Sequence, residues 1–194
     1  MYSAKNVIRS RMKKSREDYF KSLSDAVRID LNKKLVKNIL GLIPSNTQGP
    51  VAGFWPMSFE PDIRPVLETL IPQGRRALLP VTQELGAPLI FRSWKPGDRL
   101  QESSFKTMEP LSNAPLYDPE VILVPLLAFD GRGHRLGYGV GHYDRTIQCL
   151  QKKKISILTI GVAFEVQRVN ELPMASYDQP LHWVVTEEKV YKFI

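Results

Sequence analysis

The sequence of 194 residues contains one cysteine, Cys149, so the chain cannot form an internal disulfide. A lone thiol without a partner motif suits a reducing compartment, and we expect Cys149 in the core or on a helix face. No run of about 18 apolar residues occurs, so no membrane-spanning helix is expected. The first residues, Met1 to Asn6, lack the apolar segment of a secretory signal. These absences predict a cytoplasmic protein that has no membrane partner.

Several motifs of nucleotide and metal sites are also missing. The chain has neither the Gly-x-Gly-x-x-Gly pattern of dinucleotide-binding folds nor the Gly-x-x-x-x-Gly-Lys-Ser/Thr pattern of P-loop enzymes. The spacing of His134, His142 and His182 matches neither a metal site nor a catalytic triad. Neither zinc spacing nor a ribonucleoprotein motif supports binding to nucleic acid.

Positive charge is concentrated at the start of the chain. The formal net charge is +7, and residues 1–40 hold eleven Lys and Arg against four Asp and Glu, while the remainder is balanced. Three interpretations stay open for this segment. It is a solvated helical face, a nucleic-acid patch, or a lid that binds a polyanionic small molecule.

Two helices are expected in this basic segment. Residues 3–20 have Val7, Ile8 and Met12 on one side and Arg9, Lys13 and Arg16 on the other. Ser24 is a suitable N-cap for a second helix, which ends near Gly41. The length favours one domain over residues 1–194, in which residues 1–42 form a helical segment packed on an α/β core.

The rest of the chain alternates strands with helices. Strands are expected at residues 51–56, 77–81, 89–94, 121–124, 155–164 and 183–185. A helix is expected from Pro61 to about residue 71, with residues 101–115 irregular and a short tail at the end. A strand, a helix and a second strand in succession indicate a right-handed crossover. We therefore predict a three-layer α/β/α sandwich with a mostly parallel central sheet and an N-terminal basic helical segment.

Glycines follow the strand at residues 121–124. After a turn and Arg135, three glycines alternate at Gly137, Gly139 and Gly141, and a helix can begin at His142. Glycines let the backbone approach an anion, and a helix start favours negative charge. Arg135 and Arg145 flank the loop and could clamp phosphate oxygens. A glycine-rich turn that binds nothing is the alternative.

Residues 125–145 resemble the signature of the 5-formyltetrahydrofolate cyclo-ligases, usually P-x-L-A-F-D-x-x-G-x-R-L-G-Y-G-G-G-Y-Y-D-R. Here the segment reads Pro125-Leu-Leu-Ala-Phe-Asp130 and then Gly133-His-Arg-Leu-Gly-Tyr-Gly-Val-Gly-His-Tyr-Asp-Arg145. Val140 stands where the family usually has glycine, and His142 where it has tyrosine. Near the end, Tyr177 stands where the family has histidine.

The resemblance implies binding sites for ATP and folate. Lys5 and Arg9 match the family's Lys-x-x-x-Arg and would bind the triphosphate together with Arg135. The loop would hold its oxygens through Leu136, Gly137, Tyr138, Gly139, Val140, Gly141, His142 and Tyr143. Trp55 and Glu60 match the folate-binding segment, although a core tryptophan and a helix N-terminal acid are the simpler interpretations of these two residues.

The resemblance also places the family's Mg²⁺ ligands at Asp144 and Asp178. Magnesium takes carboxylate oxygens together with phosphate oxygens and water. Without the resemblance, Asp144 would be an acid favoured by the helix dipole and Asp178 a turn residue.

The implied reaction is the ATP- and Mg²⁺-dependent cyclisation of 5-formyltetrahydrofolate to 5,10-methenyltetrahydrofolate, through an N5 iminium phosphate, with release of ADP and phosphate. The basic N-terminus would suit polyglutamylated folate, and nucleic acid is not an expected partner. Two alternatives stay open. One is a sugar-phosphate isomerase or coenzyme A transferase-like enzyme, and the other is a non-catalytic nucleotide- or RNA-binding module.

Overall fold

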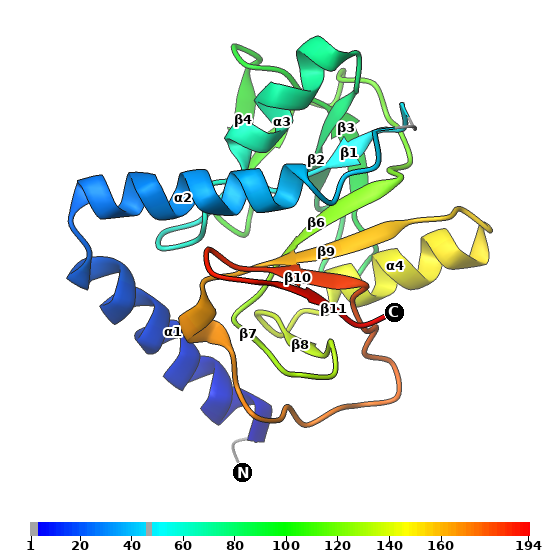
Figure 1. The fold of residues 1–194 in the computed structure, drawn as a ribbon. Coiled ribbons are helices and arrows are strands. Elements are labelled where there is room, and N and C mark those ends of the chain that lie inside the picture. Colours follow the sequence, from blue (N-terminus) through cyan, green and yellow to red (C-terminus); the bar gives the residue numbers. More distant parts are fainter. Residues whose placement is uncertain (1–3, 46–47) are drawn as a thin grey trace.

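The central feature of the fold is a seven-stranded sheet in the order β11-β10-β9-β6-β1-β2-β3 (Figure 1). The computed structural model describes residues 4–45 and 48–194. The pairings from β10 through β9, β6 and β1 to β2 are parallel, and the edge strands β11 and β3 are antiparallel to their neighbours. The prediction of a mostly parallel sheet is confirmed. The strands are β1 (Val51–Ala52), β2 (Ala77–Val81), β3 (Ile90–Ser93), β6 (Val121–Pro125), β9 (Leu158–Val162), β10 (Trp183–Val185) and β11 (Val190–Lys192).

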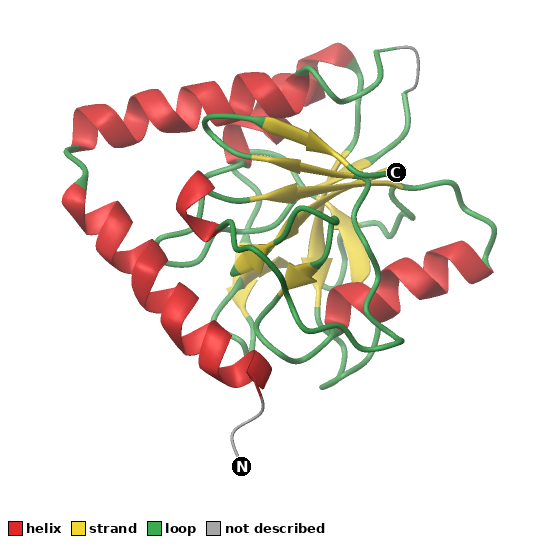
Figure 2. Ribbon diagram, turned by 60° about the horizontal axis from the view of Figure 1, so that its bottom comes forward, coloured by secondary structure: helices red, strands yellow, loops and turns green. Residues whose placement is uncertain are grey.

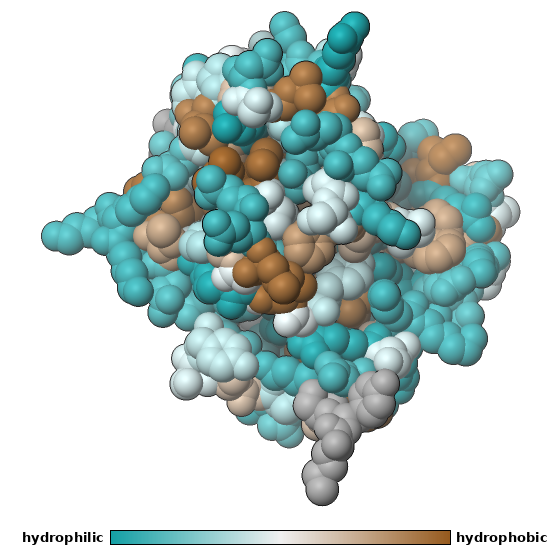
Figure 3. Space-filling view, turned by 180° about the vertical axis from the view of Figure 1, so that it is seen from behind, coloured by the Kyte–Doolittle hydropathy of each residue, from teal (hydrophilic) through white to brown (hydrophobic). Residues whose placement is uncertain are grey.

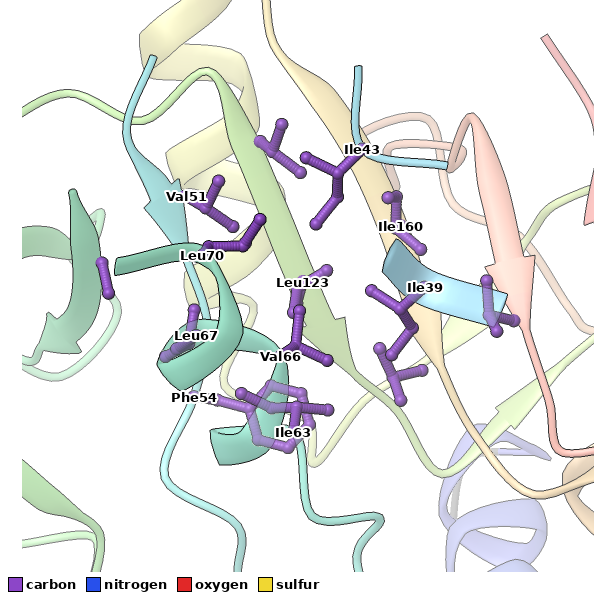
Figure 4. Packing of buried hydrophobic residues seen from close by; sticks show 14 of the residues in the cluster. Ile39, Ile43, Val51, Phe54, Ile63, Val66, Leu67, Leu70, Leu123 and Ile160 are labelled. Carbon is purple, nitrogen blue, oxygen red and sulfur yellow. The ribbon is translucent and has the colours of Figure 1, made fainter. Parts of the chain in front are cut away.

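Helices cover both faces of this sheet, which makes three layers. Alternate side chains of a strand point to opposite faces. In β6, Leu123 therefore packs with α2 and α3, as Figure 4 shows, while Ile122 packs with Ile147 of α4 on the other face. Because both faces are buried, the strand is apolar throughout. The helices are α1 (Ala4–Ser22), α2 (Asp25–Leu40), α3 (Arg64–Leu70), η1 (Ile71–Gln73), α4 (His142–Lys152) and η2 (Glu165–Gln167).

The first two helices meet at an angle (Figures 1 and 2). The predicted N-cap is present, since Ser24 Oγ accepts the Val27 N–H at 3.4 Å. While α2 lies on the sheet, α1 extends toward the carboxyl end of β9, where the ring of Tyr19 lies 5.6 Å from that of Phe164. The basic segment therefore reaches the edge of the sheet at which the parallel strands end.

The inward face of α1 differs from the prediction. Val7 is 60% exposed, whereas Arg16 is only 3% exposed. Lys5, Arg9, Met12 and Arg16 share one stripe of the helix, at intervals of about one turn. Apolar periodicity did not predict this inward face, because its cations contact carboxylate and carbonyl oxygens of other segments. Residue 3, expected at the start of the helix, lies outside the described residues.

Three local predictions are wrong. The helix expected from Pro61 begins at Arg64, because Asp62 Oδ1 accepts the Arg64 N–H at 3.0 Å in a turn before it. Residues 101–115, expected to be irregular, contain the antiparallel strands β4 (Leu100–Glu102) and β5 (Met108–Pro110). The tail contains β11, which is held in place because Tyr191 packs on Phe129 with ring centroids 5.4 Å apart.

Among the described residues, no helix combines the length and apolar character needed to cross a bilayer. On the face seen in Figure 3, hydrophobic residues form patches separated by hydrophilic ones.

Cys149 lies half-buried on α4, as predicted, and is a free thiol.

Candidate functional site at the carboxyl edge of the sheet

The segments singled out in the sequence follow the carboxyl ends of β1 and β6. Trp55 and Glu60 come after β1. After β6 come the paired strands β7 (Ala128–Phe129) and β8 (Arg135–Leu136), then the glycine loop. Parallel strands end at a common edge, and open α/β sheets bind ligands outside that edge. Since α1 reaches the same edge, these parts of the predicted site come together on one side of the sheet.

The glycine loop, residues 137–141, leads from β8 into α4. Gly139 (φ 105°) and Gly141 (φ 77°) have left-handed backbone conformations, which favour glycine. Gly141, which has no side chain, is the N-cap of α4, and no side chain among the described residues accepts a hydrogen bond from the first N–H groups of this helix. The free N–H groups and the helix dipole therefore favour an anion at this position. The predicted order of strand, glycine loop and helix is confirmed.

Two arginines contact the loop from different helices. Arg9 Nε of α1 donates to the Gly137 carbonyl at 3.0 Å, and the Arg145 guanidinium of α4 donates to the Val140 carbonyl. A Cβ atom at Gly139 would lie 3.1 Å from the Arg9 guanidinium carbon. The glycines thus allow both the backbone turn and the close approach of cations, which suits a bound polyanion.

Arg135 belongs to β8, just before the loop, and its side chain is only 5% exposed. It donates to Asp144 Oδ1 at 2.8 Å and to the carbonyl of Gln179. Burial lowers the pKa of Arg135 from its ordinary value, and the charges of Asp144 and Asp178 oppose this lowering. The guanidinium therefore contacts Asp144 directly and is influenced by the charge of Asp178, the two aspartates that were predicted to bind metal.

Asp178 pairs with the N-terminal helix. Lys5 Nζ lies 2.5 Å from Asp178 Oδ2, which also accepts the Ala175 N–H at 2.7 Å. The same ammonium lies 5.9 Å from the centre of the Tyr177 ring. Lys5, predicted to bind phosphate, and Asp178, predicted to bind metal, are thus adjacent.

The two aspartates fit a magnesium ion that arrives with phosphate. Among the described residues, Asp144 Oδ2 and Asp178 Oδ1 accept no hydrogen bond, so each carboxylate keeps one oxygen for another partner. The described part of the chain has no group of three or more His, Cys, Asp or Glu side chains arranged for a metal. Mg²⁺ commonly needs only one or two carboxylates when phosphate oxygens and water complete its shell.

Glu60 is buried, 7% exposed, at the centre of a charged network. Its Oε1 accepts the Tyr138 hydroxyl at 2.6 Å and lies 3.4 Å from Arg16 Nη1, and its Oε2 accepts the Met57 N–H at 2.9 Å. Arg16 Nη2 also donates to the Tyr138 hydroxyl oxygen at 2.8 Å. Burial, followed by the charge of Glu60, raises the pKa of Tyr138, so the phenol stays protonated as the donor.

Trp55 lies in a more apolar setting than Glu60. Its ring packs edge-on against Trp94 with centroids 6.1 Å apart, and the Arg64 guanidinium lies 4.9 Å from its centre. Trp55 is partly buried and packs against the core cluster on the α2 and α3 side of the sheet. The observed contacts therefore match the simpler interpretation of a packing residue, and its proposed role toward folate requires the exposed part of the ring.

The residues on either side of the glycine loop, which were also predicted to bind ATP, differ in which of their atoms a ligand can reach. The side chain of Leu136 is buried against Met12 and Leu172, so only its backbone is available to a ligand. His142 Nδ1 lies 2.7 Å from the Ala87 carbonyl, which ties the start of α4 to the loop after β2. Burial raises the pKa of Tyr143, with the charge of Glu60 as the next cause, so this phenol also remains protonated.

The sequence alone did not identify Arg16 as part of the site. It was placed on the basic side of the helix with Arg9 and Lys13 and given no role, yet it is buried against Glu60 and Tyr138. A signal was available, because Arg16 is seven residues, about two helical turns, after Arg9 and so lies on the same face.

The sequence model of the 5-formyltetrahydrofolate cyclo-ligase family matches residues 1–187. The chain belongs to this family. The 5-formyltetrahydrofolate cyclo-ligase of Escherichia coli is 38% identical over 148 residues, which cover 74% of this chain and 80% of that protein. The cyclo-ligase of Haemophilus influenzae is 30% identical over 154 residues, which cover 77% of this chain and 81% of that protein. The resemblance first seen around the glycine loop is confirmed.

Solved structures show the same cyclo-ligase fold. The 5,10-methenyltetrahydrofolate synthetase of Aquifex aeolicus superposes with a TM-score of 0.79 and 27% identity, covering 98% of this chain and 93% of that one. The synthetase of Mycoplasma pneumoniae gives a TM-score of 0.73, covers 95% of this chain and 99% of its own, and at 19% identity supports the fold alone.

Proposed function

We propose that this chain is a ligase that cyclises 5-formyltetrahydrofolate to 5,10-methenyltetrahydrofolate at the expense of ATP. Membership of the cyclo-ligase family over residues 1–187 supports the reaction. The glycine loop is the observation that carries the requirement for ATP. It ends in a helix start without a side-chain cap and lies between Arg9 and Arg145.

The triphosphate binds to Lys5, Arg9, Arg135 and the loop backbone. Arg9 already lies on the loop, so it can reach phosphate oxygens there with little rearrangement. Lys5 is paired with Asp178 at 2.5 Å. In the proposed complex Lys5 would pair with a phosphate oxygen, and Asp178 would be available to hold the metal ion. Exchange of one partner for another of like charge keeps each group neutralised.

Asp144 and Asp178 would hold Mg²⁺, since each keeps one carboxylate oxygen that accepts no hydrogen bond from described residues. When bound with ATP, the ion neutralises charge that develops on the transferred phosphoryl group. Arg135 keeps Asp144 in place and adds a second positive charge beside it.

The folate binds on the side of Trp55 and Glu60. Glu60 accepts a hydrogen bond from an N–H group of the reduced pterin, and Trp55 packs on the pterin or the aminobenzoyl ring. The basic N-terminal segment also suits a polyglutamylated folate. Nucleic acid and membranes are not among the proposed partners, and a cytoplasmic location remains a prediction.

The chemistry requires placement and charge neutralisation more than a reactive side chain. The formyl oxygen attacks the γ-phosphorus of ATP, ADP leaves, and an N5 iminium phosphate forms. N10 then bonds to the activated carbon and loses its proton, and phosphate departs with the former formyl oxygen. The site must hold two ligands in line and exclude water, as in other phosphoryl transfers.

The test of this proposal is absorbance at the methenyltetrahydrofolate band with 5-formyltetrahydrofolate present. We expect absorbance to grow only when ATP and Mg²⁺ are both supplied, with ADP formed in equal amount. A sugar-phosphate isomerase or coenzyme A transferase-like enzyme needs neither ATP nor Mg²⁺ for its reaction. A folded, ATP-binding protein that forms no methenyl product would contradict the proposal.

A further inference from the structure

The buried network around Glu60 joins three parts of the chain that are distant in sequence. Arg16 belongs to α1, Glu60 follows β1, and Tyr138 lies in the glycine loop, 122 residues from Arg16 and 78 from Glu60. The side chains of Arg16 and Glu60 are 4% and 3% exposed. Removing charges from water is costly, and a buried pair of this kind is weak evidence for stability by itself. Its place between the two proposed ligand sites gives a functional reason for it.

The hydrogen bonds at Glu60 leave one carboxylate oxygen for a ligand. Each oxygen of a carboxylate has about two lone-pair directions. Oε1 uses both, one for the Tyr138 hydroxyl and one for Arg16, whereas Oε2 accepts only the Met57 N–H among the described residues. The proposed folate N–H group therefore finds its acceptor at Oε2, and Arg16 and Tyr138 fix the orientation of the carboxylate.

The same helix face that holds Glu60 also holds the nucleotide loop. Arg9 donates to the Gly137 carbonyl at 3.0 Å, and Arg16 donates to the hydroxyl of Tyr138 at 2.8 Å. Lys13 adds a second cation near Tyr138, 5.7 Å from its ring centre. These contacts hold α1 docked on the loop. A ligand that depends on them favours this docked state over a looser one.

We propose that Arg16 is a positioning residue that couples nucleotide binding to folate binding, an inference that rests on the proposed function. ATP on Lys5, Arg9 and the loop favours the docked state of α1. Docking fixes Arg16 and Tyr138, and these two groups orient Glu60 before folate arrives. A ligand that finds its site already ordered binds more tightly, so each ligand raises the affinity for the other by the same factor.

The test measures the dissociation constant of 5-formyltetrahydrofolate with and without Mg²⁺ and a non-hydrolysable ATP analogue. In the unaltered protein we expect the analogue to tighten folate binding roughly five- to hundredfold, the usual range of such couplings. Arg16→Lys keeps the charge but replaces the two nitrogens that meet Glu60 and Tyr138 with one, on a side chain one bond shorter, so we expect it not to reproduce both contacts. We expect it to weaken folate binding much more in the presence of the analogue than in its absence, which brings the coupling factor close to one.

Two further variants keep the test decisive if Arg16→Lys folds poorly. Tyr138→Phe preserves the ring and the pair of Arg16 and Glu60, and removes only the hydroxyl that joins them to the loop, so the coupling should also be lost. Arg11→Met, an exposed position of the same helix, should keep the coupling of the unaltered protein. Coupling that survives both Arg16→Lys and Tyr138→Phe would overturn the inference, as would its absence in the unaltered protein. Failure of the unaltered protein to bind either ligand would instead reject the proposed function.

Discussion

The position and charge environment of Asp178 depend on a residue that is far away in sequence. It lies 173 positions from Lys5, yet their charged atoms are 2.5 Å apart. No periodicity in the sequence reports such a pairing, because local patterns carry information only about neighbouring turns and strands. The assignment of both residues to the site came from the family motifs at the two ends of the chain.

If Asp178 binds Mg²⁺, then Asp178→Asn should raise the Mg²⁺ concentration needed for half-maximal rate about tenfold or more, since even outer groups of metal sites cost that much. The measurement is the rate of methenyl formation against Mg²⁺ at saturating ATP. Asp118→Asn is the matched control, because Asp118 pairs with Lys153 on the surface at 3.2 Å. An unchanged Mg²⁺ dependence in Asp178→Asn would remove this residue from the metal site.

His182 gives a prediction about pH. Its Nδ1 accepts the Thr159 N–H at 3.1 Å, and burial lowers the pKa of His182 below the ordinary value of 6.5. Below about pH 6.5 the unfolded chain therefore binds a proton that the folded chain does not, so the free energy of unfolding falls as pH falls. This contribution is fully present above pH 6.5 and is lost toward the lowered pKa.

The variant His182→Asn isolates this effect, because an amide oxygen can accept the Thr159 N–H without titrating. We expect the thermal midpoint to fall less steeply between about pH 7 and 5.5 than in the unaltered protein. The comparison is needed because burial also raises the pKa of Glu187, which acts in the opposite direction. Parallel pH profiles for the two proteins would show that His182 does not contribute.

At the level of elements, apolar periodicity predicted helices well where they pack on apolar strands. α4 begins at His142 as expected, and the N-cap of α2 is the expected Ser24. Periodicity predicted the helix α1 and the burial of Met12, but it did not predict that Lys5, Arg9 and Arg16 also face inward. A rule that places charge outside cannot foresee cations that meet carboxylates and carbonyls at a site.

The glycine loop makes a second prediction at this level. In Gly139→Ala the alanine must adopt the left-handed backbone conformation of Gly139, which is unfavourable for a residue with a Cβ atom. Its methyl group would also lie 3.1 Å from the guanidinium carbon of Arg9. We expect a loss of about 1–2 kcal/mol in stability and a weakening of ATP binding by roughly tenfold. Calorimetric titration with ATP and thermal unfolding measure the two effects.

Gly97→Ala separates backbone strain from the displacement of Arg9. Gly97 has φ 90° and no atom within 4 Å of its Cβ position. We expect the Gly97→Ala variant to lose about as much stability as Gly139→Ala and to keep the ATP affinity of the unaltered protein. Equal ATP affinities in the two variants would mean that Arg9 has no part in the loop's affinity for ATP.

For the whole molecule, the order of segments was enough to predict a mostly parallel sheet between helices. A helix that connects two strands brings them side by side as parallel neighbours, and the crossover is almost always right-handed. The chain ends were less predictable. β11 is a short strand that depends on pairing with β10 and on the contact of Tyr191 with Phe129. Its three residues, Val190–Lys192, carry too little pattern to be recognised alone.

The basic N-terminal segment has its explanation at this scale too. Two of its inward cations meet carboxylates, Lys5 at Asp178 and Arg16 at Glu60, and Arg9 meets the loop. These three inward contacts agree with the proposal that the segment binds a polyanionic small molecule. The other cations of the segment are mostly exposed, among them Lys14 and Lys34, so the interpretation as a solvated helical face applies to them.

The most direct test of the account follows the formyl oxygen through the reaction. 5-Formyltetrahydrofolate carrying a heavy oxygen isotope in the formyl group is converted with ATP and Mg²⁺, and the released phosphate is analysed by mass spectrometry. Attack of the formyl oxygen on the γ-phosphorus predicts one labelled oxygen in each phosphate for each methenyl product formed. Unlabelled phosphate, or methenyl formation without ATP, would contradict the proposed phosphoryl transfer and with it the assignment of the glycine loop.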